Sequence, residues 1–287
     1  MRFEYLEPKT IEEAVSLLQE YDGRAKVIAG GTDLLVQIRD GKIAPEFVVD
    51  IGRIGGLDTV KYDDGQGLTI GALTPIRALE KSSVLQQRLP IISQAAGQLG
   101  SVAIRNVGTV GGNLCNAAPS AETAPALIAL SGNVRIVGPR GERRVPLEDF
   151  FIGPGATVLA PGELMVEIQV PEPAPNTKGN YLKHGMRGTI DLAVVGVAVV
   201  TTFESDNETC SDIKIVLGAV APTPIRARTA EELLRGKKIE EALINQSAKA
   251  AVSDSQCISD VRASAEYRRE MVEVFTRRAL RGVMIGK

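Results

Sequence analysis

Two pairs of adjacent glycines are the residues of this sequence whose type and spacing point most directly to chemistry. Gly30 and Gly31 lie in the segment AGGTDL, and Gly111 and Gly112 lie in the segment TVGGN. Adjacent glycines let a backbone adopt positive φ and approach a ligand without a Cβ clash. Peptide N–H groups presented by such turns, ahead of a helix, bind anions. Together the segments could hold one pyrophosphate from both sides, which indicates a dinucleotide site; the alternative is two tight turns that bind nothing.

Other kinds of nucleotide, metal or nucleophile site lack a motif. No G-x-G-x-x-G follows a predicted strand and no G-x-x-x-x-G-K-[ST] occurs, so neither a Rossmann nor a Walker site is indicated. The single histidine, His184, has no nucleophile motif nearby, and we assign no catalytic residue. Cys115, Cys210 and Cys257 are too dispersed for a zinc or iron–sulfur pattern, so no metal ligand is assigned. Cys115 adjoins the second glycine pair and is interpreted as a small buried thiol.

The first glycine pair lies between a predicted strand and a predicted helix. A capping box at 10–13 opens a helix, and residues 26–29 form a short strand that leads into the glycines. Thr32 or Asp33 then caps a second helix, and residues 47–51 form a second strand. These elements predict a small α/β unit over residues 1–55.

The remaining chain predicts a second unit and a C-terminal domain. For the second unit, over 56–173, we expect strands at 67–72, 134–137 and 164–170, a helix over 90–99 and a helix capped by Ser120. The three prolines of 171–176 mark a linker. For the C-terminal domain, over 178–287, we expect three antiparallel strands at 181–186, 193–202 and 211–219, followed by a capping box at 229–232 and a helical bundle. The fold class expected is α+β.

Composition excludes several classes of function. The 287 residues carry a formal net charge of −2 and no tryptophan, which argues against nucleic-acid binding. The longest apolar run, 192–200, is too short to span a bilayer, and the first residues lack the apolar core of a signal peptide. Three scattered cysteines are typical of a reducing compartment, so we expect a cytoplasmic protein.

The glycine segments also carry a family resemblance. The stretches VIAGGTDLL (27–35), RNVGTVGGNLCNA (105–117) and APSAET (118–123) resemble the flavin-binding domain of the FAD subunit of molybdenum hydroxylases, the xanthine, carbon monoxide and nicotinate dehydrogenase type. Residues from Tyr181 onward resemble the small C-terminal domain of the same subunits, with Lys183, Arg187 and Asp191 in the expected places. The resemblance implies FAD between two small α/β units, and the bottom-up interpretation of the glycine pairs agrees with it.

The resemblance also implies which residues contact FAD. The segment 27–34 and the segment 109–113 would hold the pyrophosphate. Leu99 and Met165 match positions that pack against the cofactor, although both are equally suited to a plain core. Glu122 matches a position that is usually Asp, and Lys183 matches a lysine near the flavin, where a cation raises the two-electron potential. The full set is Val27, Ile28, Ala29, Gly30, Gly31, Thr32, Asp33, Leu34, Leu99, Thr109, Val110, Gly111, Gly112, Asn113, Glu122, Met165 and Lys183.

The function implied is electron transfer within a heterotrimer. Electrons would come from molybdopterin on a large subunit, cross [2Fe–2S] clusters on a small subunit, reach FAD on this chain and leave to NAD⁺ or another acceptor. With three cysteines and no visible insertion, the extra iron–sulfur loop of hydroxybenzoyl-thioester reductases is not expected. Two alternatives stay open at this point: a stand-alone flavin reductase, for which no acid or substrate pocket is evident, and a flavin-free interaction subunit.

Overall fold

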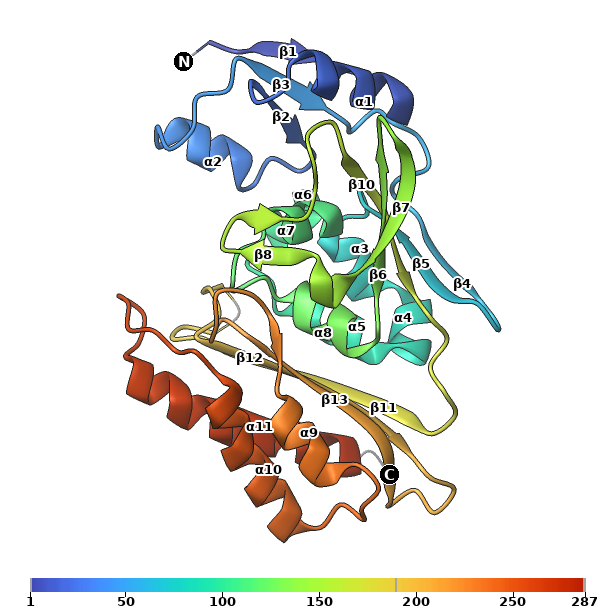
Figure 1. Cartoon of the computed structure of the whole chain (residues 1–287), viewed down its shortest axis with the longest axis vertical. Helices are drawn as coiled ribbons and strands as arrows, with labels where there is room; N and C mark the ends of the chain where they lie inside the picture. The colour runs from blue at the N-terminus through green and yellow to red at the C-terminus, as the bar shows by residue number, and fades with distance from the viewer. Residues whose placement is uncertain (1, 189, 286–287) are drawn as a thin grey trace.

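Three blocks follow one another along the long axis of the molecule (Figure 1). The computed structural model describes residues 2–188 and 190–285. The first block holds a three-stranded parallel sheet in the order β1-β3-β2 and two helices. Its elements are β1 (Glu4–Leu6), α1 (Ile11–Glu20), β2 (Ala25–Ile28), α2 (Leu34–Arg39) and β3 (Phe47–Asp50). This is the predicted N-terminal α/β unit, with the first glycine pair between β2 and α2.

The middle block is a five-stranded antiparallel sheet covered by short helices. The strand order is β4-β5-β10-β6-β7. Its strands are β4 (Val60–Asp63), β5 (Gly67–Gly71), β6 (Asn133–Gly138), β7 (Gly141–Pro146) and β10 (Leu164–Val170), with a separate hairpin of β8 (Phe151–Gly153) and β9 (Ala156–Thr157). Its helices are α3 (Ile76–Lys81), α4 (Ser83–Arg88), α5 (Pro90–Gly97), α6 (Val102–Val107), α7 (Val110–Cys115), α8 (Thr123–Ala129) and the 3₁₀ turn η1 (Leu147–Asp149). The second glycine pair lies inside α7.

The C-terminal block is an antiparallel sheet backed by three helices. The three predicted strands are β11 (Thr177–His184), β12 (Val195–Phe203) and β13 (Cys210–Gly218), and a fourth, β14 (Ile225–Arg226), pairs with β13. The helices are α9 (Arg228–Leu234), α10 (Glu241–Asp254) and α11 (Ala265–Ile285). No helix in the described residues is long and apolar enough to cross a membrane. The expected α+β class, with helices and strands mixed along the whole chain, is confirmed.

Two of the caps expected in the second unit and the C-terminal domain do not form. The helix assigned to Ser120 begins at Thr123, with Glu122 at the N-cap position and no side-chain cap bond. The helix assigned to the 229–232 box begins at Arg228, and the Thr229 hydroxyl donates to Asp254 of α10 instead. By contrast, Thr10 accepts from the amide of Glu13 at 3.1 Å, so the cap at Thr10 is confirmed, while the Glu13 carboxylate accepts from the amide of Lys9 rather than that of Thr10. At Thr229, a tertiary partner takes the side chain that the local pattern assigns to a cap.

Candidate functional site

A cavity of about 680 Å³ lies between the N-terminal and middle blocks, with residues 190–192 of the C-terminal block on its rim. Both glycine segments line it, as do Leu99, Glu122 and Met165. Of the residues singled out from the sequence, all but Ile28, Val110 and Lys183 form its wall. Segments about 80 residues apart in the chain therefore meet around one space, as a shared ligand requires.

The first glycine segment presents unused backbone donors to this cavity. Gly31 adopts φ +70°, a left-handed conformation that favours glycine. In the described chain, the N–H groups of Gly30, Gly31, Thr32 and Asp33 donate to no protein atom. Unpaired amides on a turn ahead of a helix suit an anionic oxygen. The segment therefore has the geometry expected for a pyrophosphate.

The second glycine segment is built differently, because the amides of residues 110–113 are already bonded within the protein. Thr109 caps α7 by accepting from the Gly112 amide at 3.0 Å, and the Val110 and Gly111 amides donate to carbonyls of Thr74 and Ala72. A Cβ on Gly111 would lie 2.7 Å from Ala72. Gly111 is needed here for close packing, while the run of four consecutive free amides belongs to the first segment.

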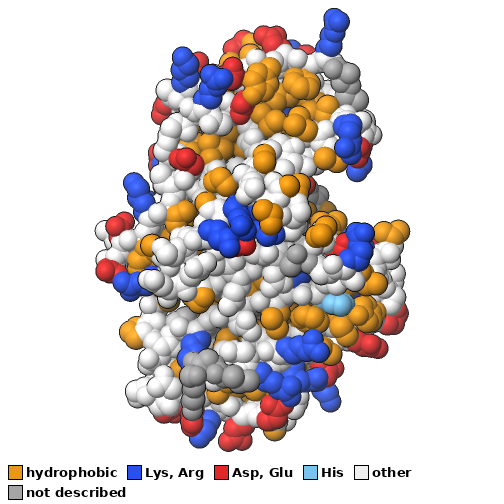
Figure 2. All heavy atoms as spheres, turned by 180° about the vertical axis from the view of Figure 1, so that it is seen from behind, with side chains coloured by type: hydrophobic (Ala, Val, Ile, Leu, Met, Phe, Trp, Pro, Cys, Tyr) orange, Lys and Arg blue, Asp and Glu red, His pale blue; other side chains and the backbone are white. Residues whose placement is uncertain are grey.

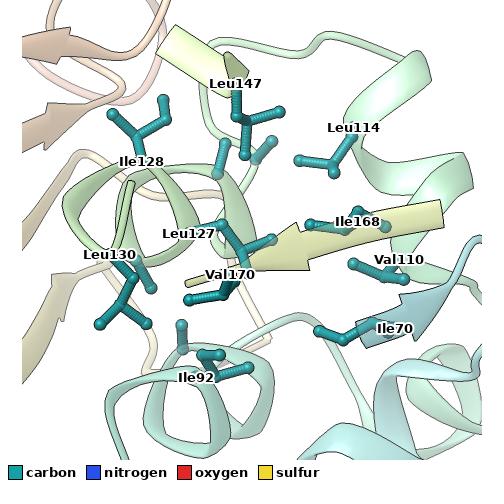
Figure 3. Close-up of a cluster of buried hydrophobic side chains, with 14 of the residues drawn as sticks. Ile70, Ile92, Val110, Leu114, Leu127, Ile128, Leu130, Leu147, Ile168 and Val170 are labelled. Carbon is teal, nitrogen blue, oxygen red and sulfur yellow. The ribbon is translucent and has the colours of Figure 1, made fainter. Parts of the chain in front are cut away.

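Helix α7 is anchored to the core through two apolar side chains. Figure 3 shows Val110 and Leu114 among the buried side chains around β10, together with Leu127 of α8. Val110 is fully buried, which explains why it does not reach the cavity although its neighbours do. Asn113, on the cavity side, accepts a 2.6 Å hydrogen bond from the Thr123 hydroxyl. Its amide oxygen is thus oriented by α8.

Glu122 and Lys183 form a buried ion pair beside the cavity. The Lys183 ammonium lies 2.8 Å from the Glu122 carboxylate and also donates to the Gln98 carbonyl at 2.7 Å. The two side chains are only 2% and 6% exposed. Burial raises the pKa of the Glu122 carboxyl, and the charge of Lys183 opposes this rise. Glu122 lines the cavity and Lys183 does not, so Lys183 influences the cavity through its contact with Glu122.

Asp33 departs from the expected capping role. It occupies the N-cap position of α2, yet its side chain makes no cap bond. Its carboxylate instead accepts from Asn116 Nδ2 at 3.0 Å, at the end of α7. Burial raises the pKa of Asp33, an effect that the Thr32 hydroxyl partly offsets.

Sequence reasoning missed several residues of the cavity wall. Asn116, Ala118 and Ser120 lie inside the motif stretches used for the resemblance, so a residue-by-residue reading of those stretches would have found them. Other wall residues, among them Lys26, Gln37, Ala72, Ile104, Glu163, Ile190 and Leu192, carry no local signal. They reach the cavity only because the three blocks pack together.

His184 lies apart from this cavity wall. Its Nε2 is 3.0 Å from the Tyr267 hydroxyl, and its ring centroid is 5.2 Å from that of Phe275. Burial, followed by the nearby Arg278, lowers its pKa. Figure 2 shows hydrophobic side chains around this single histidine on the C-terminal block. These contacts support a packing role.

Comparison with known proteins identifies relatives along nearly the whole chain. Residues 1–173 match the family described as the FAD binding domain in molybdopterin dehydrogenase, and residues 180–283 match the CO dehydrogenase flavoprotein C-terminal domain. The carbon monoxide dehydrogenase medium chain of Hydrogenophaga pseudoflava is 36% identical over 279 residues, 97% of this chain and 96% of that protein. The xanthine dehydrogenase FAD-binding subunit of Escherichia coli O157:H7 is 31% identical over 277 residues, 96% and 94% of the two chains.

The structural comparison agrees. A solved structure of carbon monoxide dehydrogenase from Hydrogenophaga pseudoflava, lacking the Mo-pyranopterin moiety of its molybdenum cofactor, matches with a TM-score of 0.94 at 36% identity. The match covers 99% of this chain and 97% of that chain. The cavity and both glycine segments fall within the matched length.

Proposed function

This chain belongs to the FAD-binding medium subunits of the molybdenum hydroxylases, and from that membership we propose that it relays electrons. In the proposed path, [2Fe–2S] clusters on a small partner subunit supply electrons to FAD in the cavity, and NAD⁺ or another acceptor removes them. The substrate is oxidised on a large molybdopterin subunit. The observation that carries the proposal is the joining of both glycine segments around one cavity.

The cavity wall fits FAD by its chemistry. The unpaired amides of residues 30–33 would bind the pyrophosphate, with the Gly30 and Gly31 backbone able to approach it closely. Leu99 and Met165 offer apolar surface to the ring systems. FAD, when bound, supplies the redox chemistry and accepts electrons singly or in pairs. The chain's own residues bind, orient and tune it.

The pair of Glu122 and Lys183 contributes to the electrostatic environment of the cavity. Glu122 faces the cavity and holds the Lys183 ammonium 2.8 Å away, so the pair presents a fixed dipole with no net charge. We propose that it orients polar groups at the ring end. Ile28 and Val110 do not line the cavity, and we propose that they support its wall. Ile28 is the last residue of β2, before the first glycine segment, and the buried Val110 anchors α7.

We also propose the domain division 1–173 and 178–287, with units 1–55 and 56–173 in the first part. The separate family matches at 1–173 and 180–283 support it. Three cysteines without disulfides in the described structure support a cytoplasmic location.

A visible spectrum of the purified chain, followed by heat release of the nucleotide, tests the proposal. We expect flavin absorption bands and released FAD. A colourless chain that also fails to take up added FAD would contradict it and favour a flavin-free interaction subunit. Anaerobic addition of NADH tests the acceptor. Bleaching of the flavin bands supports NAD⁺, whereas bleaching by dithionite alone points to another acceptor.

A further inference from the structure

Asn116 joins the two walls of the cavity. It lies at the C-cap of α7, where its Nδ2 donates to Asp33 at 3.0 Å and its Oδ1 accepts from Gln37 Nε2 at 3.3 Å. Both partners belong to α2 or its N-cap, in the N-terminal block. Within residues 2–188 and 190–285, these are the two side-chain hydrogen bonds that link segment 1–55 to segment 56–173. All three residues line the cavity.

The contact diverts Asp33 from its ordinary role. An aspartate at an N-cap usually accepts from an amide in the first turn of its own helix. Here that bond is absent and the carboxylate is held against the opposite wall. The Asp33 amide, and those of Gly30, Gly31 and Thr32, stay free of protein acceptors. The carboxylate is therefore fixed by α7 of the middle block, beside a turn whose amides are free for an anion.

We propose that Asn116 is a positioning residue for FAD: it fixes the spacing of the two walls and holds the Asp33 carboxylate against α7, next to the turn whose amides receive the pyrophosphate. The inference rests on the proposed binding of FAD in this cavity. A carboxamide suits the task because it donates to a carboxylate and accepts from an amide at once. Neither leucine nor aspartate can do both.

Titration of deflavinated protein with FAD, following flavin fluorescence, measures the effect. We expect Asn116→Ala to raise Kd about tenfold, since one charge-assisted and one neutral hydrogen bond are lost. Gln37→Ala removes only the neutral bond and should raise Kd about threefold. Asn133→Ala is the matched control: its amide donates to the Ser131 carbonyl outside the cavity, so Kd should not change.

A charge exchange separates positioning from general stability. Asn116→Asp places two carboxylates together, so its Kd should exceed that of Asn116→Ala at pH 8 and fall as the pH is lowered towards 5. The double variant Asp33→Asn/Asn116→Asp restores a donor facing an acceptor, and Gln37 can still donate. Its Kd should return to within about threefold of wild type and lose the pH dependence. The midpoint of thermal unfolding without FAD reports any general destabilisation.

The outcomes are distinguishable. If wild-type protein binds FAD and Asn116→Ala binds it within twofold as tightly, the positioning role is wrong and the proposed function stands. A charge-exchanged variant as weak as Asn116→Asp at every pH also overturns the role. If Asn116→Ala does not fold, Gln37→Ala and the charge exchange decide. Wild-type protein that binds no FAD overturns both proposals.

Discussion

At the scale of single residues, Gly30 shows why glycine is required in this site. A Cβ at Gly30 would lie 2.1 Å from the carbonyl oxygen of Val107, a backbone atom that cannot rotate away. The first glycine segment and the end of α6 are thus in backbone contact. Gly31 needs glycine for its positive φ, whereas Gly30 needs it for this contact. The adjacent pair serves two different physical requirements.

Gly30→Ala should therefore separate the two cavity walls. The added methyl forces the segments apart, and we expect FAD content after purification to fall at least tenfold. Gly55→Ala is the control, because a Cβ there meets nothing within 4 Å and the φ of Gly55 is not positive. Flavin-to-protein ratio from the absorption spectrum measures both. Full loading of Gly30→Ala would show that the contact with Val107 is not required.

The buried pair of Glu122 and Lys183 allows a second prediction at this scale. Removing one partner of a buried pair leaves an uncompensated charge and costs about 3–5 kcal/mol. We expect Lys183→Met to destabilise FAD-free protein by an amount of this order in urea unfolding. The double variant Lys183→Met/Glu122→Gln should recover most of the loss. A single variant as stable as wild type would mean that Glu122 is reached by water.

The sequence could predict the residue types of the site better than their roles. The glycine pairs, Thr109 and Asn113 were identifiable from local pattern, and they do line the cavity. The indirect position of Lys183 was not, because it depends on where β11 lies against α8, a relation between residues 61 apart in the chain. Likewise, the local pattern predicts Asp33 as a helix cap, because it contains no sign of the hydrogen bond from the distant Asn116.

At the scale of elements, one buried guanidinium fixes α11 to the residue before β12, the residue after β13 and the loop before α11. Arg268 is 1% exposed; it donates to the carbonyls of Val194 and Ala219 and to the Asp260 carboxylate at 2.8 Å. Hydrogen bonds from Arg262, and then from Arg268, hold the pKa of Asp260 well below its usual range. The ion pair therefore ties α11 to the loop that precedes it in a pH-dependent way, while the two carbonyl contacts tie the helix to the ends of β12 and β13.

Asp260→Asn should destabilise the protein by about 2 kcal/mol near neutral pH, because a charged acceptor is lost. Since the folded pKa is depressed, the stabilisation is complete above the unfolded value of about 4 and is lost as pH falls below it. Urea unfolding at several pH values should show wild type and variant converging in acid. Asp212→Asn, which loses an exposed pair with Arg235, is the control and should cost under about 1 kcal/mol. A constant difference across pH would contradict the assignment.

At the scale of the whole molecule, the three blocks share their cores. On β13, Val216 lies in the cluster of the middle block, while Ile215 and Leu217 lie in the cluster of the C-terminal helices. On β10, Leu164 and Val166 pack towards the N-terminal block and Ile168 packs into the middle block. At each boundary between two blocks, a strand therefore contributes side chains to the cores on both sides.

One strand at these shared cores carries a sequence signature of burial on both faces. The run VGVAVVTTF of β12 is almost continuously apolar, as expected for a strand covered on both faces. Alternation of apolar and polar residues predicts a strand with one face in solvent. It therefore identifies a strand but does not indicate that its other face also packs against protein. The prolines of 171–176 indicate where the chain crosses between blocks, and nothing in them indicates that the blocks pack against each other.

We therefore expect the FAD-free chain to unfold in one cooperative transition in differential scanning calorimetry, with a ratio of calorimetric to van't Hoff enthalpy near one. Val216→Ala should lower the midpoint and keep a single transition, because a small cavity weakens the shared core without opening it. Val216→Asp places a carboxylate between the middle and C-terminal blocks and should split the transition in two. Two transitions in the wild type would mean that the blocks fold independently despite their common sheets.

FAD at 100-fold excess over Kd should raise the midpoint of the single transition by an amount that corresponds to about 2.7 kcal/mol. For a cooperative molecule, the whole transition moves together.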